Sequence, residues 1–218
     1  MSRDNEQAGA SSVPEGRPEV VMAPAQQDDG ETLARLWSDA FKGQLEYMLG
    51  EATCPVLTEW FQRDQRILDG TTLARVDGTA VGYIQVSGKQ RVSVRAALSL
   101  ITLLWRHFGL TSGIKRLIQM SLTELQHRYG PKDLYVLMLG VAAPWRGHGV
   151  GTRLLAFAEQ EARQHGKTGL SLTVDRHNPG ARRLYERSGF VAGPLQHFRF
   201  EQWADGTDGY YMMRKTLD

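Results

Sequence analysis

A glycine-rich segment in the second half of the chain has the residue types that hold a phosphate group. It follows an apolar run, opens an amphipathic pattern and consists of Arg146, Gly147, His148, Gly149, Val150, Gly151 and Thr152. Glycines let the backbone approach a ligand closely. The free N–H groups and positive dipole end of a helix start attract an anion. The segment therefore predicts a cradle for a phosphate or pyrophosphate, although such glycines also serve simply as a tight corner between strand and helix.

A second group of residues, about thirty positions further on, offers a helix cap and a proton donor. Asn178 precedes Pro179, which suits the first turn of a helix, and Gly189 suits its end. Tyr185 lies on this helix beside Leu184. A phenol, with an ordinary pKa near ~10, donates a proton to a thiolate of pKa about 8.5 at modest cost. The alternative role for Tyr185 is packing of an aromatic ring.

The elements that position these residues form a compact βαβα unit. An apolar strand at 134–139 leads into the glycine segment, and apolar residues then recur at helical spacing as far as Gly166. Residues 169–174 alternate like a strand. The helix with Asn178 and Tyr185 follows.

This combination resembles the GNAT superfamily of acyl-CoA-dependent N-acyltransferases. The residues that carry the resemblance are Arg146, Gly149, Gly151, Asn178, Ala181, Leu184, Tyr185, Gly189 and Phe190. It implies that the backbone from Arg146 to Thr152 binds the diphosphate of the acyl donor, acetyl-CoA, with added charge from Arg146. It also implies contact of Asn178 with the pantetheine arm and a role for Tyr185 as general acid.

The resemblance further implies that the strand before the glycine segment diverges from its neighbour and that the pantetheine arm lies in the gap like an added strand. Leu139, Gly140 and Val141 would supply backbone contacts, including one N–H to the thioester oxygen. Gly140 would also permit a β-bulge. The side chains of Leu139 and Val141 are expected simply to be buried.

The rest of the chain predicts an α/β (α+β) fold with a GNAT-like, mostly antiparallel mixed sheet of about six or seven strands flanked by helices. The pattern predicts a strand at 19–23, helices around 33–41 and 57–61, and a hairpin of 72–76 with 81–86 about Asp77-Gly78. Two further strands are expected at 196–202 and 209–217. Residues 1–17 are expected to be a disordered tail and 18–218 a single domain.

Residues from about 90 to 130 form an unusually long connection before the central strand. They contain two apolar, helix-like stretches divided near Gly109. Two interpretations fit. In the first, these residues form a helical hairpin that packs on the sheet and fills out either the core or the contact of a homodimer. In the second, they form a lid or wall of the acceptor pocket.

A dinucleotide-binding Rossmann unit is a rival interpretation of the glycine segment, with Asp175 as the acid that binds a ribose. The spacing lacks a third glycine at the required position, however, and only one such unit is visible. Tyr185 would have no role in it.

Composition excludes several other classes. The single cysteine, Cys54, cannot form an intrachain disulfide, and the six histidines are scattered, so no metal is expected. The net charge of +2 does not indicate a nucleic-acid partner. We find neither a secretory signal nor a transmembrane pattern, and we expect a cytoplasmic protein.

The resemblance therefore predicts an N-acetyltransferase that uses acetyl-CoA as cosubstrate and acetylates a primary amine of a small molecule or a protein. No general base is evident, because the strand at 134–139 lacks a carboxylate and Asp133 lies at its outer end. Glu124, His127, His197 and Glu201 are candidates by residue type alone. A non-catalytic acyl-CoA-binding regulatory module is the main alternative, and a nucleic-acid-associated factor using the basic insertion is a weaker one.

Overall fold

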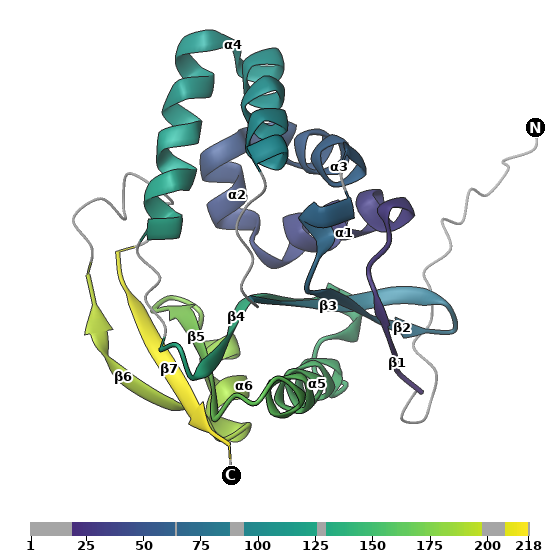
Figure 1. Ribbon diagram of the computed structural model, residues 1–218, viewed down its shortest axis with the longest axis vertical. Helices are drawn as coiled ribbons and strands as arrows, with labels where there is room; N and C mark the ends of the chain where they lie inside the picture. The colour runs from purple at the N-terminus through teal and green to yellow at the C-terminus, as the bar shows by residue number, and fades with distance from the viewer. Residues whose placement is uncertain (1–18, 64, 88–93, 126–129, 198–207, 218) are drawn as a thin grey trace, which may run out of the picture.

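The computed structural model describes residues 19–63, 65–87, 94–125, 130–197 and 208–217. The predicted tail, 1–17, lies outside these residues. Seven strands form one sheet in the order β1-β2-β3-β4-β5-β7-β6 (Figure 1). The pairing of β4 with β5 is parallel, and every other described pairing is antiparallel. The predicted fold class is confirmed, and a doubly wound Rossmann sheet is excluded.

The elements follow the order that the sequence predicts, with one helix more. The strands are β1 (Val21–Pro24), β2 (Thr71–Val76), β3 (Thr79–Ser87), β4 (Asp133–Val141), β5 (Gly169–Asp175), β6 (Val191–Gln196) and β7 (Tyr210–Thr216). The α-helices are α1 (Gly30–Ala40), α2 (Lys42–Leu49), α3 (Thr53–Arg63), α4 (Val94–Leu125), α5 (Val150–Gln164) and α6 (Pro179–Arg187). The sequence interpretation missed α2.

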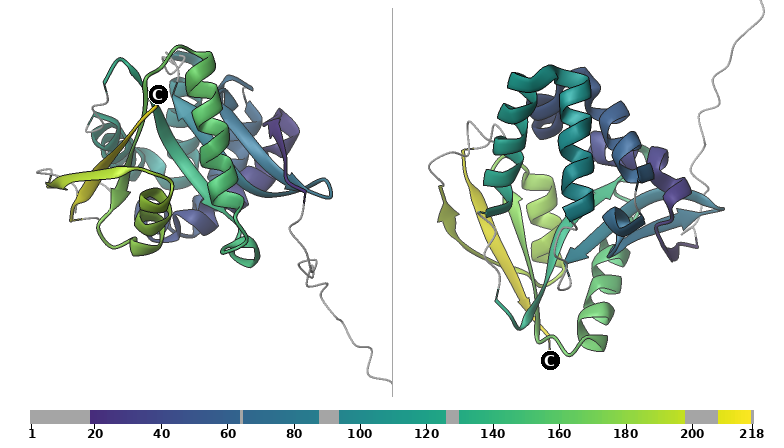
Figure 2. Two further views of the ribbon diagram at one scale, coloured as in Figure 1. Left: turned by 90° about the horizontal axis from the view of Figure 1, so that it is seen from below. Right: turned by 45° about the horizontal axis from the view of Figure 1, so that its top comes forward.

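Helices cover both faces of the sheet. Helices α1 to α4 lie on one side and α5 and α6 on the other (Figures 1 and 2). Leu154, Leu155, Ala158 and Ala162 recur at helical spacing along α5 and are fully buried against the sheet. On the opposite face, a second apolar cluster joins α1 and α3 to β2 and β3. The site elements are therefore held between two apolar layers.

The β2–β3 hairpin turns at Asp77-Gly78, as predicted. Both residues have positive φ, 48° and 79°, which matches the twist that a two-residue hairpin turn needs. The long hairpin then directs β3 back beside β4, where Tyr83 lies opposite Gly140.

The insertion before the central strand is α4, a pair of helices divided at Gly109, whose φ is 74°. Leu104 is fully buried against Leu49 and Val56. Glu59 of α3 also pairs with Arg106 at 2.9 Å and with His107 at 3.5 Å. The hairpin of helices therefore packs on α2 and α3 (Figure 2), which agrees with a packing role for the insertion.

Two local predictions were wrong. The bulge between β3 and β4 lies at Leu137, because Gln85 pairs with Met138 and Val86 with Val136; it does not lie at Gly140. The strand expected at 196–202 is instead β6, Val191–Gln196, and residues 198–202 lie outside the described part of the chain. The turn after Phe190 is short, so the chain begins pairing with β7 earlier than the alternating pattern indicated.

Candidate active site

The site begins where the two parallel strands of the sheet separate. β4 and β5 pair only from Asp133 to Val136 and from Gly169 to Leu172, although β4 continues to Val141 and β5 to Asp175. Beyond these pairs, no strand of the described residues lies beside one backbone edge of β4. The predicted divergence of the strand before the glycine segment is therefore present.

A cavity of about 700 Å³ opens between the diverging strands. Its walls come from both faces of the sheet: α1 and α2 with their connection contribute residues 39–45, 47 and 48, and α6 contributes Ala181, Leu184 and Tyr185. Of the predicted site residues, Leu139, Asn178 and Tyr185 line it. The cavity is large enough for part of an elongated ligand together with a small second substrate.

The glycine segment connects β4 to α5 and has the geometry of an anion cradle. Gly147 and Gly149 both have φ of 82°, and a Cβ added to either would meet no atom within 4 Å. Gly149 is the N-cap residue of α5, and no side chain caps the helix. Among the described residues, no acceptor takes a hydrogen bond from the backbone N–H groups of 147–152. These donors are available to a ligand.

The other residues of the segment fix its shape. The Val150 side chain is buried in the core, and Gly151 lies so close to α6 that an added Cβ would be 2.8 Å from Leu184 Cδ2. His148 Nδ1 lies 3.0 Å from the carbonyl oxygen of Arg146. Thr152 is exposed in the first turn of α5. The backbone of this segment is thus held from both sides, with its N–H groups free.

Arg146 lies against the end of α1. Its guanidinium donates to Asp39 Oδ2 at 2.7 Å and to the carbonyl oxygen of Val141 at 2.9 Å. Asp39 Oδ2 also accepts the N–H of Ala143 at 3.1 Å. Asp39 therefore connects α1 to the start of the glycine segment, and Arg146 already has an anionic partner. The charge contribution of Arg146 to a diphosphate stays a prediction.

Gly140 is needed for close packing within the sheet. An added Cβ there would lie 2.4 Å from Tyr83 Cε1 and 2.8 Å from Ala40 Cβ. The Tyr83 ring is fully buried and stacks on Trp37 at a centroid distance of 6.1 Å. The glycine thus lets a buried aromatic ring cover the strand that borders the cavity.

Asn178 caps α6, as predicted. Its Oδ1 accepts the N–H of Ala181 at 3.0 Å. The cap uses only the amide oxygen, so the two N–H donors of the side chain are left for another partner. Capping and ligand contact are therefore compatible at this position.

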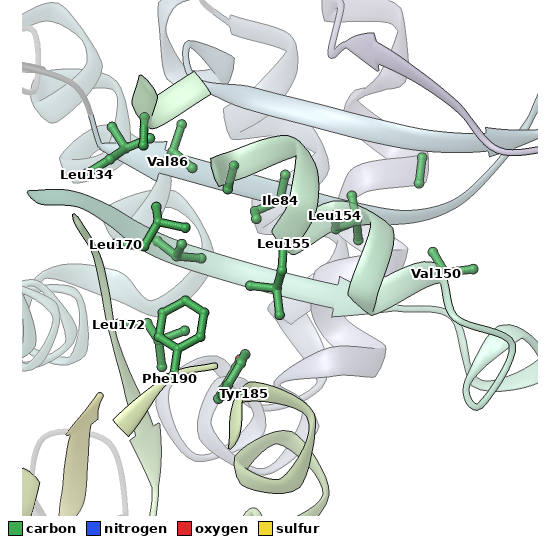
Figure 3. Close-up of a cluster of buried hydrophobic side chains, with 14 of the residues drawn as sticks. Ile84, Val86, Leu134, Val150, Leu154, Leu155, Leu170, Leu172, Tyr185 and Phe190 are labelled. Atoms are coloured by element: carbon green, nitrogen blue, oxygen red, sulfur yellow. The ribbon is translucent and has the colours of Figure 1, made fainter. Parts of the chain in front are cut away.

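Tyr185 lies on α6 with its ring packed beside Phe190 at a centroid distance of 6.0 Å (Figure 3). Only 7% of the residue is exposed, and this burial raises the pKa of Tyr185 to about 12. Within the described residues, its hydroxyl has no hydrogen-bond partner. The side chain is thus both part of the core and a protonated phenol at the cavity wall.

Four residues beside this cavity were not among the predicted site residues: Asp39, His177, Asp208 and Asp175, which was considered only as the acid of a Rossmann unit. His177 Nε2 lies 2.9 Å from Asp208 Oδ1, and Asp175 Oδ1 accepts the backbone N–H of His177 at 2.7 Å. The only sequence signal was the position of His177 immediately before the capping Asn178. Asp208 lies just before β7 in the chain, and no sequence pattern links it to His177.

The bases suggested by residue type find little support here. Asp133 is buried in a two-bond pair with Arg214, with both N–O distances at 2.9 Å. The side chains of Glu124, His127 and Glu201 lie outside the described part of the chain. His197 follows β6 and contacts the carbonyl oxygen of Asp208.

The described ranges contain no group of three or more His, Cys, Asp or Glu residues placed to hold a metal ion. They also contain no helix with the length and apolar character that crossing a bilayer requires.

Comparison with known proteins agrees with this geometry. The family model "Acetyltransferase (GNAT) family" matches residues 31–190. An acetyltransferase of Agrobacterium fabrum is 42% identical over 76 residues, which are 33% of this chain and 54% of that protein. The chain thus spans about half the length of this curated relative.

Solved structures show the same fold at low sequence identity. A crystal structure of an acetyltransferase has a TM-score of 0.57 at 20% identity, covering 91% of this chain and all of the other. The PaiA N-acetyltransferase of Thermoplasma acidophilum, solved in complex with coenzyme A, has a TM-score of 0.55 at 16% identity, with 91% and 99% covered. The chain belongs to the acetyltransferase (GNAT) family.

Proposed function

We propose that the protein transfers an acetyl group from acetyl-CoA to a primary amine of a small molecule or a protein. The observation that carries the proposal is the cavity between the diverging ends of β4 and β5, which is lined from both faces of the sheet. A donor entering on one face can there meet an acceptor entering from the other. The structurally similar PaiA protein was solved in complex with coenzyme A, which supports a coenzyme A thioester as the donor.

The residues present fit the donor. The free N–H groups of 147–152 and the positive end of the α5 dipole suit its diphosphate. Open space above Gly147 and Gly149 leaves room for the phosphate oxygens. The unpaired edge of β4 from Leu139 to Val141 suits the amide groups of the pantetheine arm, and the Asn178 side chain retains donors for the same arm.

The donor supplies an acetyl group activated as a thioester. We expect a backbone N–H of β4 near Gly140 to polarise its carbonyl oxygen. The Tyr185 hydroxyl, protonated at any working pH because of its raised pKa, gives its proton to the departing thiolate. Tyr185 is the general acid of this proposal.

Two carboxylates lie in the cavity wall, and one of them, Asp39, is already paired with Arg146. Asp39 and Asp175 line the cavity with the hydroxyl-bearing Tyr47 and Tyr210, and Lys42 lies on the α2 wall. Carboxylates attract an amine in its ammonium form. We therefore expect a cationic amine as the acceptor.

The test is incubation of the full chain with acetyl-CoA and a panel of alkyl amines and amine-bearing peptides, following release of free thiol. Thiol release that depends on the amine supports acetyl transfer. A non-catalytic acyl-CoA-binding module would instead bind coenzyme A in calorimetry and release no thiol with any amine. The presence of Tyr185 at the cavity favours the enzyme.

A further inference from the structure

The loop between β5 and α6 carries a histidine whose orientation is fixed. His177 lines the cavity together with Asp175 and Tyr185. Its backbone N–H is held by Asp175 Oδ1 at 2.7 Å, and the next residue, Asn178, caps α6. The backbone of His177 is thus anchored on both sides at the mouth of the diverging strands.

The side chain of His177 is oriented by Asp208. Its Nε2 lies 2.9 Å from Asp208 Oδ1, while Asp208 Oδ2 lies 3.3 Å from Arg176 Nη1. An ionised carboxylate only accepts hydrogen bonds, so Nε2 must carry the hydrogen of this pair. The neutral ring then has its lone pair on Nδ1. The same carboxylate would stabilise the ring after Nδ1 takes up a proton.

Acetyl transfer to an ammonium also needs a group that accepts a proton from the acceptor. An alkyl ammonium, with a pKa near ~10.4, must lose a proton before it attacks a carbonyl carbon. Asp39 is occupied by Arg146 and the N–H of Ala143. Imidazole is closer in proton affinity to an amine than a carboxylate is, so His177 is better suited than Asp175.

We propose that His177 takes the proton from the acceptor ammonium on Nδ1, with Asp208 as its positioning residue. This assignment rests on the proposed acetyl transfer. The ammonium gives one proton to His177, which passes it to solvent. The free amine nitrogen then forms a bond to the acetyl carbon as the C–S bond breaks. The sulfur takes the proton of Tyr185, and the second proton lost by the nitrogen restores the phenol.

Other charged and titratable groups surround His177 and belong in any pH analysis of it. Those in the described residues come from the end of β5, the segment after β6, the start of β7 and, across the cavity, α1 and α2: Asp175, Arg176, His197, Asp208, Tyr210, Asp39 and Lys42. Because several of them are charged, the tests compare variants at a single pH.

The first test compares two acceptors in the full chain. His177→Gln should lower kcat about 100-fold with an alkyl amine, which is an ammonium at pH 7, and should leave the affinity for coenzyme A unchanged. With a weakly basic amine that is already neutral at pH 7, the same variant should retain nearly wild-type kcat. Equal loss with both acceptors would overturn the assignment.

Matched variants separate the orienting role from general damage. Asp208→Ala should reproduce part of the loss with the alkyl amine. His165→Gln, a change at an exposed histidine at the end of α5, is the control and should keep wild-type rates. Wild-type rates in Asp208→Ala would show that Asp208 does not position the His177 ring.

A second measurement does not depend on turnover. Nitrogen-15 NMR of the imidazoles should show His177 with its hydrogen on Nε2 in the wild-type chain and without this preference in Asp208→Ala. A hydrogen on Nδ1 in the wild type would overturn the proposal, even with acetyl transfer intact. Absence of acetyl transfer in the wild-type chain itself would instead overturn the proposed function.

Discussion

At the scale of single residues, the burial of Tyr185 has two opposite effects on its role as an acid: it keeps the hydroxyl protonated, and it makes the proton harder to transfer. Its burial in the core raises its pKa to about 12, which keeps the hydroxyl protonated. The same shift makes complete proton transfer to a thiolate of pKa about 8.5 uphill by roughly 5 kcal/mol, at 1.36 kcal/mol per pKa unit. We therefore expect the proton to move together with cleavage of the C–S bond.

Replacing Tyr185 with phenylalanine isolates the hydroxyl. Because the ring packing beside Phe190 is retained, Tyr185→Phe should fold normally and bind coenzyme A with nearly wild-type affinity. Its kcat should fall about 100-fold, the range of general acid catalysis. Steady-state kinetics measures kcat, and calorimetry measures the affinity for coenzyme A. Wild-type turnover in this variant would show that Tyr185 is not the acid.

Tyr83 also carries a buried hydroxyl, but unlike the Tyr185 hydroxyl it has no proposed role in catalysis. Neither its hydroxyl nor the Nε1 of the neighbouring Trp37 has a partner within the described residues. Burial, with smaller effects of Tyr185 and Asp39, raises the pKa of Tyr83 well above 10. Above pH 10 the unfolded chain loses the Tyr83 proton while the folded chain keeps it. Stability is therefore full below that pH and is lost as pH rises further.

The change Tyr83→Phe should therefore stabilise the fold. Removing an unsatisfied buried hydroxyl should raise the free energy of unfolding by about 1 kcal/mol at pH 7. The alkaline loss of stability should also begin at a higher pH. Denaturant unfolding between pH 7 and 11 checks both effects, with the exposed Tyr47→Phe as control. A loss of stability at pH 7 would mean that the hydroxyl has a partner that stabilises the fold.

At the scale of elements, strand β4 determines whether the site forms. It pairs with β3 along its length but with β5 only near its start, and this difference creates the cavity. Gly140 allows Tyr83 and Ala40 to pack over the same strand. The bulge at Leu137 lies where the parallel pairing ends, so the strand changes course at that point.

Gly140→Ala should be destabilising although it adds a single methyl group. The new Cβ would lie 2.4 Å from the buried Tyr83 ring, which cannot move without displacing Trp37. We expect a loss of about 1–3 kcal/mol in the free energy of unfolding, typical of overpacking in a core. Chemical denaturation measures it. In a Tyr83→Ala background the clash with the ring is gone, so adding Gly140→Ala should lower the free energy of unfolding by less than it does in the wild type. An equal loss in the two backgrounds would refute this explanation.

Much of the element order could be predicted from the sequence because local signals mark it. Asp77-Gly78 marks the hairpin, the spacing of Leu154, Leu155 and Ala158 marks α5, and Asn178 marks the start of α6. The predictions failed where long-range packing decides the result. The bulge is set by register with β3, and the pair of His177 with Asp208 joins residues 31 positions apart in loops on different elements.

At the scale of the whole molecule, the site exists because two halves of the chain meet at one gap in the sheet. The α1–α2 region and α6 line the cavity from opposite faces of the sheet. In the proposed function the α1–α2 region is the acceptor wall, and the β4–α5 segment with α6 forms the donor side. The pair of Arg146 with Asp39 joins these halves. The helices of α4 stand apart from this gap, and the described lining of the cavity includes no residue from them.

Binding of the coenzyme A diphosphate in the proposed function requires the free N–H groups at the start of α5. The variant Gly149→Asn tests this requirement directly. Asparagine tolerates the left-handed backbone of this position, and its side chain would fill the open space that a phosphate needs without unfolding the chain. In calorimetry the wild-type chain should bind coenzyme A, and the variant, with unchanged thermal stability, should bind it at least tenfold more weakly. Equal affinity of the two proteins would contradict the assignment of the diphosphate to this segment.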